Sequence, residues 1–147
     1  VLIVGPSGSG KSTLIEKTFE NSQYIRSTAT RDIRPGEVPG KDYIFTDKAS
    51  FEKMLKNNEL IQYAKYDGNY YGVTKEEIHS KLKEHDVVAL PVVYLSVKDF
   101  KKFAVEEKNI KVIPVFTYIS KNALMEHFKS RTDTPAQKKD RVSRYES

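Results

Sequence analysis

The chain contains no cysteine and no long apolar run, and each absence excludes a class of protein. Without cysteine there is no disulfide framework, no zinc–thiolate site and no cysteine nucleophile. This residue usage suits a reducing compartment, so we expect a cytoplasmic location. No stretch approaches the roughly 20 uninterrupted apolar residues that a membrane-spanning helix requires. We therefore expect neither a helical membrane protein nor a disulfide-stabilised one.

Glycine is also scarce, and its placement is informative. The chain has only seven glycines in 147 residues. They fall into three clusters, which are Gly5, Gly8 and Gly10, then Gly36 and Gly40, then Gly68 and Gly72. Clustered glycines mark places where the backbone turns sharply or closely approaches another group. The remaining composition, 38% hydrophobic and 31% charged, fits one globular domain.

The charge balance is positive but dispersed. A formal net charge of +5 and a sequence pI near 9.2 favour anionic partners. The lysines and arginines are scattered along the chain instead of forming one basic tract. A nucleic acid, an anionic lipid surface and nucleotide phosphates would all fit this charge, so the motifs must identify the anion. The motifs described below favour a nucleotide, and with them we expect no nucleic-acid partner and no membrane partner.

Apolar runs at the two ends of the sequence predict an α/β core. Residues 1–4 form a short, branched and unalternated run that is typical of a buried strand, and residues 12–20 have the pattern of a helix. Residues 87–95 and 110–119 are two further candidates for buried strands, and residues 96–109 between them are loosely helical. Strands alternating with helices favour a parallel sheet.

The central third of the chain has a different character. Asp67-Gly68 is a hairpin signal, and short alternating segments occupy residues 43–45 and 61–64. These patterns predict an inserted, mostly β subdomain.

Helix starts are also readable in the sequence. Thr74 with Glu77 forms a capping box that opens a helix, and Ser50 is expected to cap a short helix over residues 51–56. Thr134-Pro135 marks another start, because proline suits the first helical position. The chain begins inside an apolar run and ends in helix-like sequence, so we expect both ends to be trimmed.

One motif carries a specific chemistry. The stretch G-P-S-G-S-G-K-S satisfies the P-loop pattern in full, directly after a predicted strand and before a predicted helix. Its residues are Gly5, Pro6, Ser7, Gly8, Ser9, Gly10, Lys11 and Ser12. Backbone N–H groups of such a loop bind phosphate oxygens, Lys11 would reach the β- and γ-phosphates, and the Ser12 hydroxyl could ligate Mg²⁺. The pattern predicts binding of a nucleoside triphosphate.

Two further stretches carry a family resemblance. Residues 27–45, which begin S-T-A-T-R, and residues 58–72, which end N-Y-Y-G, resemble the monophosphate-binding domain of guanylate kinases. The resemblance implies a P-loop NTPase-type parallel sheet with helices on both faces, a β-rich monophosphate-binding subdomain and a helical lid. The implied divisions are a core over residues 1–26 and 80–147, a subdomain over residues 27–79, and a lid near residues 130–141.

The resemblance also assigns an acceptor site. It places Ser27 and Gln62 near the base, and Arg31, Arg34, Tyr43 and Tyr71 around the acceptor's phosphate. Two guanidinium groups and two phenol hydroxyls suit a dianionic phosphate, because they combine charged bidentate donors with neutral ones. The alternative is a surface ion-pair network with tyrosines packed beneath it.

The lid and the base-reading residues depart from the family pattern. Arg131 and Arg141 are the best matches to the lid arginines that stabilise the transferred phosphoryl group. Gln62 stands where the family has a glutamate, and Pro91 and Val93 stand where it has aspartates. Because guanine presents N–H donors, these replacements leave base selectivity and metal support open.

The sequence as a whole predicts a kinase that transfers the γ-phosphoryl of ATP to GMP or dGMP with Mg²⁺. The residues expected to stabilise the transfer are Lys11, Arg31, Arg131 and Arg141. One alternative is a non-catalytic, guanylate kinase-like module that binds phosphoproteins, although the complete P-loop argues against it. Another is a P-loop kinase for a different monophosphate acceptor.

Overall fold

A parallel sheet of three strands forms the centre of the fold. The computed structural model of the chain describes residues 1–6 and 8–130. The strand order is β6-β1-β7, with β1 at Leu2–Val4, β6 at Leu90–Val92 and β7 at Pro114–Phe116. Both neighbours run parallel to β1, and Leu2 lies opposite Leu90 and Pro114. The predicted parallel sheet is confirmed.

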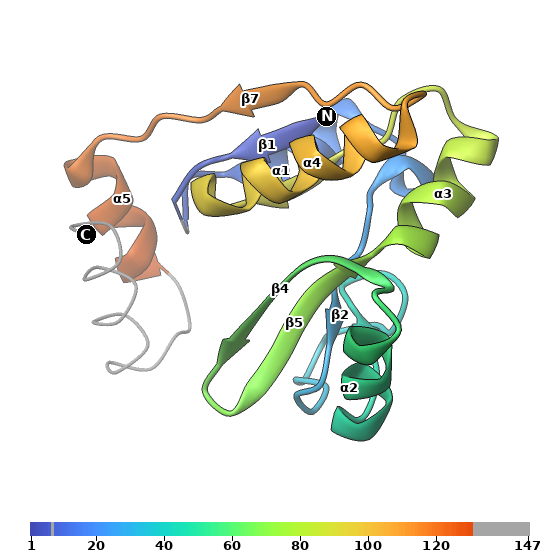
Figure 1. The fold of residues 1–147 in the computed structure, drawn as a ribbon. Coiled ribbons are helices and arrows are strands. Elements are labelled where there is room, and N and C mark those ends of the chain that lie inside the picture. The colour runs from blue at the N-terminus through green and yellow to red at the C-terminus, as the bar shows by residue number, and fades with distance from the viewer. Residues whose placement is uncertain (7, 131–147) are drawn as a thin grey trace.

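Helices cover both faces of this sheet (Figure 1). On one face, Leu2 and Val4 pack in the main core cluster with Phe100 of α4 (Val97–Glu107). On the other face, Ile3 packs against the fully buried Ile15 of α1 (Lys11–Thr18). Successive strand residues point to opposite faces, so β1 needs apolar partners on both sides. The predicted α/β fold with helices on both faces is confirmed.

A second, mostly antiparallel sheet comes from the middle of the chain. Its order is β3-β2-β5-β4, with β2 at Thr28–Ala29, β3 at Ile44–Phe45, β4 at Leu60–Tyr66 and β5 at Asn69–Thr74. The hairpin between β4 and β5 turns at Asp67-Gly68, where both residues have positive φ. Helix α2 (Lys48–Lys56) packs on β5, and its buried Phe51 stacks on Tyr70 with ring centroids 5.2 Å apart. Figure 1 shows this sheet and α2 as a separate layer below the parallel sheet.

The helix starts were predicted with mixed success. Helix α3 (Lys75–Glu84) begins as expected, because the Thr74 side chain accepts from the Glu77 N–H at 3.1 Å. The expectation that Ser50 caps the next helix is wrong. Helix α2 begins three residues earlier, where the Asp47 carboxylate accepts from both the N–H and the hydroxyl of Ser50. A carboxylate three residues ahead is the stronger cap acceptor.

The two late strands are shorter than predicted. The segment 87–95 contains only the three residues of β6 and then a 3₁₀ turn, η2 (Tyr94–Ser96), and the segment 110–119 contains only β7. Both pair with β1, which ends at Val4 before the glycine-rich loop, so residues further along have no strand to pair with. The remaining elements are η1 (Asn21–Gln23) and α5 (Lys121–Ser130). Within the described ranges, no helix is long and apolar enough to cross a membrane.

Candidate active site

The P-loop lies between the end of β1 and the start of α1, as its motif predicts. Gly8 and Gly10 have φ of 86° and 79°, a left-handed conformation that suits glycine. Gly10 is the N-cap of α1, and no side chain caps that end. The first N–H groups of α1 are therefore left to bind an anion, and the helix dipole favours negative charge there.

The loop is braced by the residue that follows β7. Thr117 donates its backbone N–H to the Val4 carbonyl at 2.7 Å, and its hydroxyl lies 2.8 Å from the Ser9 hydroxyl. A Cβ on Gly5 would overlap Thr117 Oγ1 and would lie 2.7 Å from Ser9 Oγ. Glycine is thus required at position 5 by close approach. Thr117 was missed in the sequence, since only strand pairing brings it beside the loop.

Lys11 has the properties of a phosphate-binding lysine. Its Nζ donates to the Pro6 carbonyl at 2.7 Å, so the side chain folds back over the loop. Burial lowers the pKa of Lys11 to about 8, because desolvation disfavours the ammonium form. An anion in the loop would oppose this shift, so the lysine is arranged to gain from a bound phosphate.

Three of the predicted acceptor residues come together in the second sheet. Arg31 follows β2, Tyr71 lies on β5 opposite Ala29, and Tyr43 precedes β3. The Arg31 Cζ lies 4.9 Å from the Tyr43 ring centroid, and the Tyr43 and Tyr71 rings meet edge to face at 6.3 Å. The arrangement joins one guanidinium to two phenols, whereas the second guanidinium that the resemblance implied, on Arg34, is exposed.

The Arg31 guanidinium also has an internal partner that the sequence did not reveal. Both of its terminal nitrogens donate to the Glu37 carboxylate, at 2.6 and 2.7 Å, and Glu37 also accepts from the Arg34 N–H at 2.9 Å. This pairing raises the pKa of Arg31 and lowers that of Glu37. The Arg31 side chain is only 9% exposed, whereas Arg34 is exposed. The ion pair foreseen as an alternative is therefore present, and it pre-orients Arg31 over Tyr43.

The expected base-reading positions carry no carboxylate. Ser27 is half-buried, and its carbonyl accepts from the Ile44 N–H at 3.0 Å. Gln62 is half-buried on β4, at an irregularity in the pairing with β5. Pro91 pairs with β1 inside β6, and Val93 directly after β6 is 56% exposed. Positions 91 and 93, in and directly after β6, are thus apolar where the resemblance implied aspartates.

Some predicted site residues cannot be placed. Ser7 of the loop, Arg131 and Arg141 of the lid, and the helix start at Thr134-Pro135 lie outside the described residues.

The donor set suits Mg²⁺ brought in by a nucleotide. Among the described side chains of residues 1–6 and 8–126, no group of three or more His, Asp or Glu residues could hold a metal ion alone. Mg²⁺ commonly takes one or two protein oxygens and completes its coordination with phosphates and water. The exposed Ser12 at the start of α1 supplies such an oxygen. The residues present therefore fit a metal that arrives with a triphosphate.

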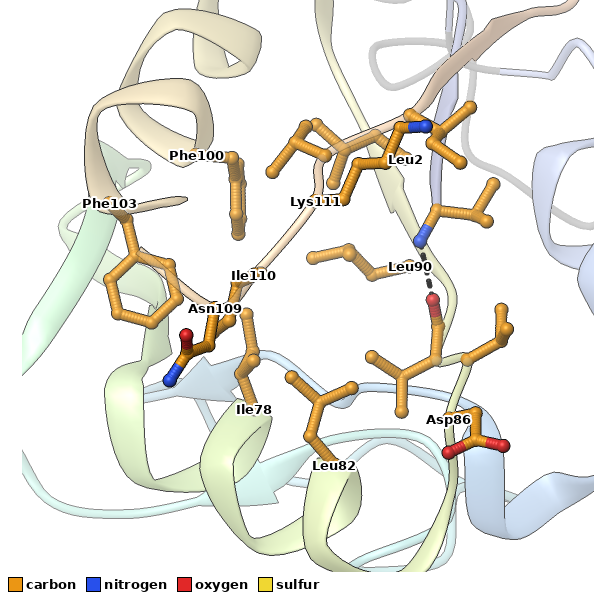
Figure 2. A pocket seen from close by; sticks show the side chains of 15 residues that line it. Leu2, Ile78, Leu82, Asp86, Leu90, Phe100, Phe103, Asn109, Ile110 and Lys111 are labelled. Atoms are coloured by element: carbon orange, nitrogen blue, oxygen red, sulfur yellow. Dashed lines mark hydrogen bonds between the residues drawn. The ribbon is translucent and has the colours of Figure 1, made fainter. Parts of the chain in front are cut away.

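An apolar cavity lies elsewhere in the molecule. It has a volume of about 320 Å³ and lies between β1, β6, α3 and α4, where Leu82, Ile78 and Phe100 line it (Figure 2). Its lining includes none of the P-loop or acceptor residues. The cavity offers few polar groups to orient a nucleotide, and we assign the site to the P-loop and the Arg31 cluster.

Comparison with known proteins identifies the family. The family model described as guanylate kinase matches residues 1–146. The chain belongs to the guanylate kinase family. The guanylate kinase of Lactococcus lactis is 43% identical over 95 residues, which cover 63% of this chain and 46% of that protein. The guanylate kinase of Buchnera aphidicola is 36% identical over 135 residues, which cover 88% and 63%.

A solved structure supports the same conclusion. The crystal structure of guanylate kinase from Anaplasma phagocytophilum matches with a TM-score of 0.54 and 26% identity, covering 79% of this chain and 57% of that one. This member of the guanylate kinase family spans about half the length of the first curated relatives it matches.

Proposed function

We propose that this chain is a nucleoside monophosphate kinase that transfers the γ-phosphoryl of ATP to GMP or dGMP. One observation supports the proposal: the chain has two separate sets of groups that are suited to binding an anion and that differ in build. One is a backbone cradle with the half-buried Lys11, and the other is the guanidinium–phenol cluster at Arg31. A kinase of this type needs both, because it must hold a donor and an acceptor phosphate at once.

On the donor side, the P-loop would bind the triphosphate through its backbone N–H groups. Lys11 would leave the Pro6 carbonyl and neutralise charge on the β- and γ-phosphate oxygens. Mg²⁺ bound with the triphosphate would offset further charge, and Ser12 would hold it. The Thr117 hydroxyl, which lies within hydrogen-bond distance of both Ser9 and the Val4 carbonyl, would hold the loop against the sheet during these changes.

On the acceptor side, Arg31 would hold the monophosphate with Tyr43 and Tyr71. Arg34 is exposed beside them and could turn toward the same phosphate. Glu37 holds Arg31 through two hydrogen bonds, so the guanidinium is fixed in orientation before the acceptor arrives. Pre-orientation lowers the entropy lost on binding. Arg131 and Arg141 would close over the transferred phosphoryl group, which excludes water and stabilises developing charge.

A crossed pair of variants tests the two-site proposal. Lys11→Ala should abolish transfer and weaken ATP binding while largely sparing binding of the monophosphate. Arg31→Met should have the opposite effect on binding: it should weaken binding of the monophosphate and leave binding of ATP unchanged. Lys17→Ala, on the exposed side of the same helix as Lys11, is the matched control and should behave like the wild type. Full turnover by Lys11→Ala would overturn the proposal.

A different acceptor base is the second candidate. The observation that favours it is the apolar surface at Pro91 and the 56% exposed Val93, where a guanine-binding acid is implied. Guanine offers N–H donors that only Gln62 among these positions could accept. Turnover with another monophosphate but not with GMP or dGMP would select this candidate.

A phosphoprotein-binding module without catalysis is the remaining alternative. Such a module would need the Arg31 cluster but not a complete triphosphate cradle. Calorimetry with ATP and Mg²⁺ separates the two cases, because the kinase should bind ATP and the module should not.

A further inference from the structure

Tyr24 connects the P-loop to the core through its hydroxyl group. Its ring packs at the edge of the cluster formed by Ile3 and Ile15, between the sheet and α1. Its hydroxyl donates to the Ser12 Oγ at 3.3 Å. The position of the ring is therefore set by core packing, while its polar end meets the side chain expected to hold Mg²⁺.

A buried arginine lies over the same ring. Arg26 is only 5% exposed, and its Cζ lies 3.5 Å from the centroid of the Tyr24 ring. Its Nη2 donates to Asn21 Oδ1 at 2.5 Å, and its backbone N–H donates to the Glu77 carboxylate at 3.0 Å. Nη1 has no hydrogen-bond partner within the described part of the chain. A buried guanidinium is costly to desolvate, and its cation–π contact with the Tyr24 ring offsets part of that cost while fixing the ring in place.

We propose that Tyr24, held in place by Arg26, positions the Ser12 hydroxyl for the Mg²⁺ of a bound nucleoside triphosphate. The inference rests on the proposed function, since it concerns the donor side of the same site. Tyr24 and Arg26 are positioning residues, because neither is expected to touch the reacting atoms.

The chemistry of a hydroxyl ligand explains why Ser12 would need Tyr24. A serine that offers a lone pair to a cation must direct its own hydrogen toward another acceptor. The family resemblance implies an aspartate in this region at position 91, but Pro91 has no side-chain acceptor. A tyrosine hydroxyl can donate or accept, so Tyr24 can donate to Ser12 in the free protein and accept from it once the cation binds. Phenylalanine would pack equally well but could do neither.

The magnesium dependence of nucleotide binding tests the inference. Calorimetry would measure ATP affinity for the wild type and for Tyr24→Phe, each in saturating Mg²⁺ and in EDTA. The affinity in Mg²⁺ should fall about three- to tenfold in the variant, the effect of one hydrogen bond, and the affinity in EDTA should not change. Tyr63→Phe, which removes a hydroxyl from an exposed tyrosine on β4, is the control and should change neither value.

The role of Arg26 is tested in the same assay. Arg26→Lys keeps the charge but loses the planar stack, so it should also reduce the advantage that Mg²⁺ gives to ATP binding. In the Tyr24→Phe background, Arg26→Lys should cause no further reduction, because the hydroxyl it positions is already gone. An additional reduction in that background would overturn the positioning role of Arg26.

The outcomes distinguish this inference from the proposed function. If the wild type binds ATP more tightly with Mg²⁺ and Tyr24→Phe keeps the full advantage, the inference is wrong and the kinase proposal stands. If the wild type binds no ATP under either condition, both are wrong. An equal loss of affinity in Mg²⁺ and in EDTA would mean that Tyr24 merely supports the loop, which also overturns the inference.

Discussion

Raising the pH should deprotonate Lys11 in the free protein while leaving the charge of the triphosphate unchanged. Burial lowers the pKa of Lys11 to about 8. At pH 9 only about one molecule in ten would then carry a charged Lys11 before nucleotide binds, against about nine in ten at pH 7. The phosphates are already ionised in this range, since their last pKa is about 6.

Nucleotide binding at high pH should therefore take up a proton. The bound triphosphate favours the ammonium form and raises the pKa of Lys11, so binding at pH 9 should take up close to one proton, about 0.9. Calorimetry in two buffers of different ionisation heat measures this number directly. Lys11→Met should show almost no uptake. No uptake by the wild type at pH 9, or equal uptake by Lys11→Met, would refute the reasoning.

The same shift fixes the sign of a stability effect. The pKa of Lys11 is lower in the folded protein than in the unfolded chain, so the unfolded chain binds more protons between about pH 8 and 10.4. The contribution of Lys11 to stability therefore rises with pH through this window. The free energy of unfolding, measured by denaturation across this pH range, should therefore rise with pH more steeply for the wild type than for Lys11→Met.

Substitutions in the P-loop, at the start of α3 and in the acceptor cluster test three separate parts of the structure. Gly5→Ala should destabilise the fold by about 1–3 kcal/mol, because its Cβ overlaps Thr117 Oγ1. Adding Thr117→Ala to this variant should recover part of the loss. Urea denaturation of the single and double variants measures both effects. Thr74→Ala should cost about 0.5–2 kcal/mol through the lost cap of α3, whereas Thr74→Ser should cost much less in the same assay. Arg31→Lys should raise the acceptor KM by about tenfold or more, because a lysine cannot supply two parallel donors, and an unchanged acceptor KM would contradict that assignment.

The features predictable from sequence were those encoded locally. The P-loop motif, the buried run before it and the helix after it are consecutive, so the order strand, loop, helix follows from the residues alone. The hairpin at Asp67-Gly68 and the cap at Thr74 are equally local. Each depends on backbone preferences within a few residues.

The features that sequence could not give depend on partners far along the chain. The lengths of β6 and β7 are set by β1, which offers only three residues for pairing. Thr117 reaches the P-loop only because β7 lies beside β1, and Tyr24 reaches Ser12 only because its ring packs under α1. The Arg31–Glu37 ion pair depends on the conformation of the glycine-containing loop between the two residues, which their spacing alone does not fix.

The acceptor site was predictable in part. The resemblance named Arg31, Tyr43 and Tyr71, and the structure brings these three together. It also named acids that this chain replaces with Pro91 and Val93, and the exposed Val93 leaves an apolar surface there. The part of the site that the sequence predicted is thus the part that would bind the phosphate.

The most direct test of the central claim is ADP release from ATP and Mg²⁺ in the presence of single monophosphates. GMP, dGMP, AMP, CMP, UMP and dTMP would be compared in parallel, with Lys11→Ala as the inactive control. We expect turnover with GMP or dGMP, and this turnover should disappear in Lys11→Ala. Absence of turnover with all six acceptors, together with retained binding of a phosphorylated ligand, would contradict it.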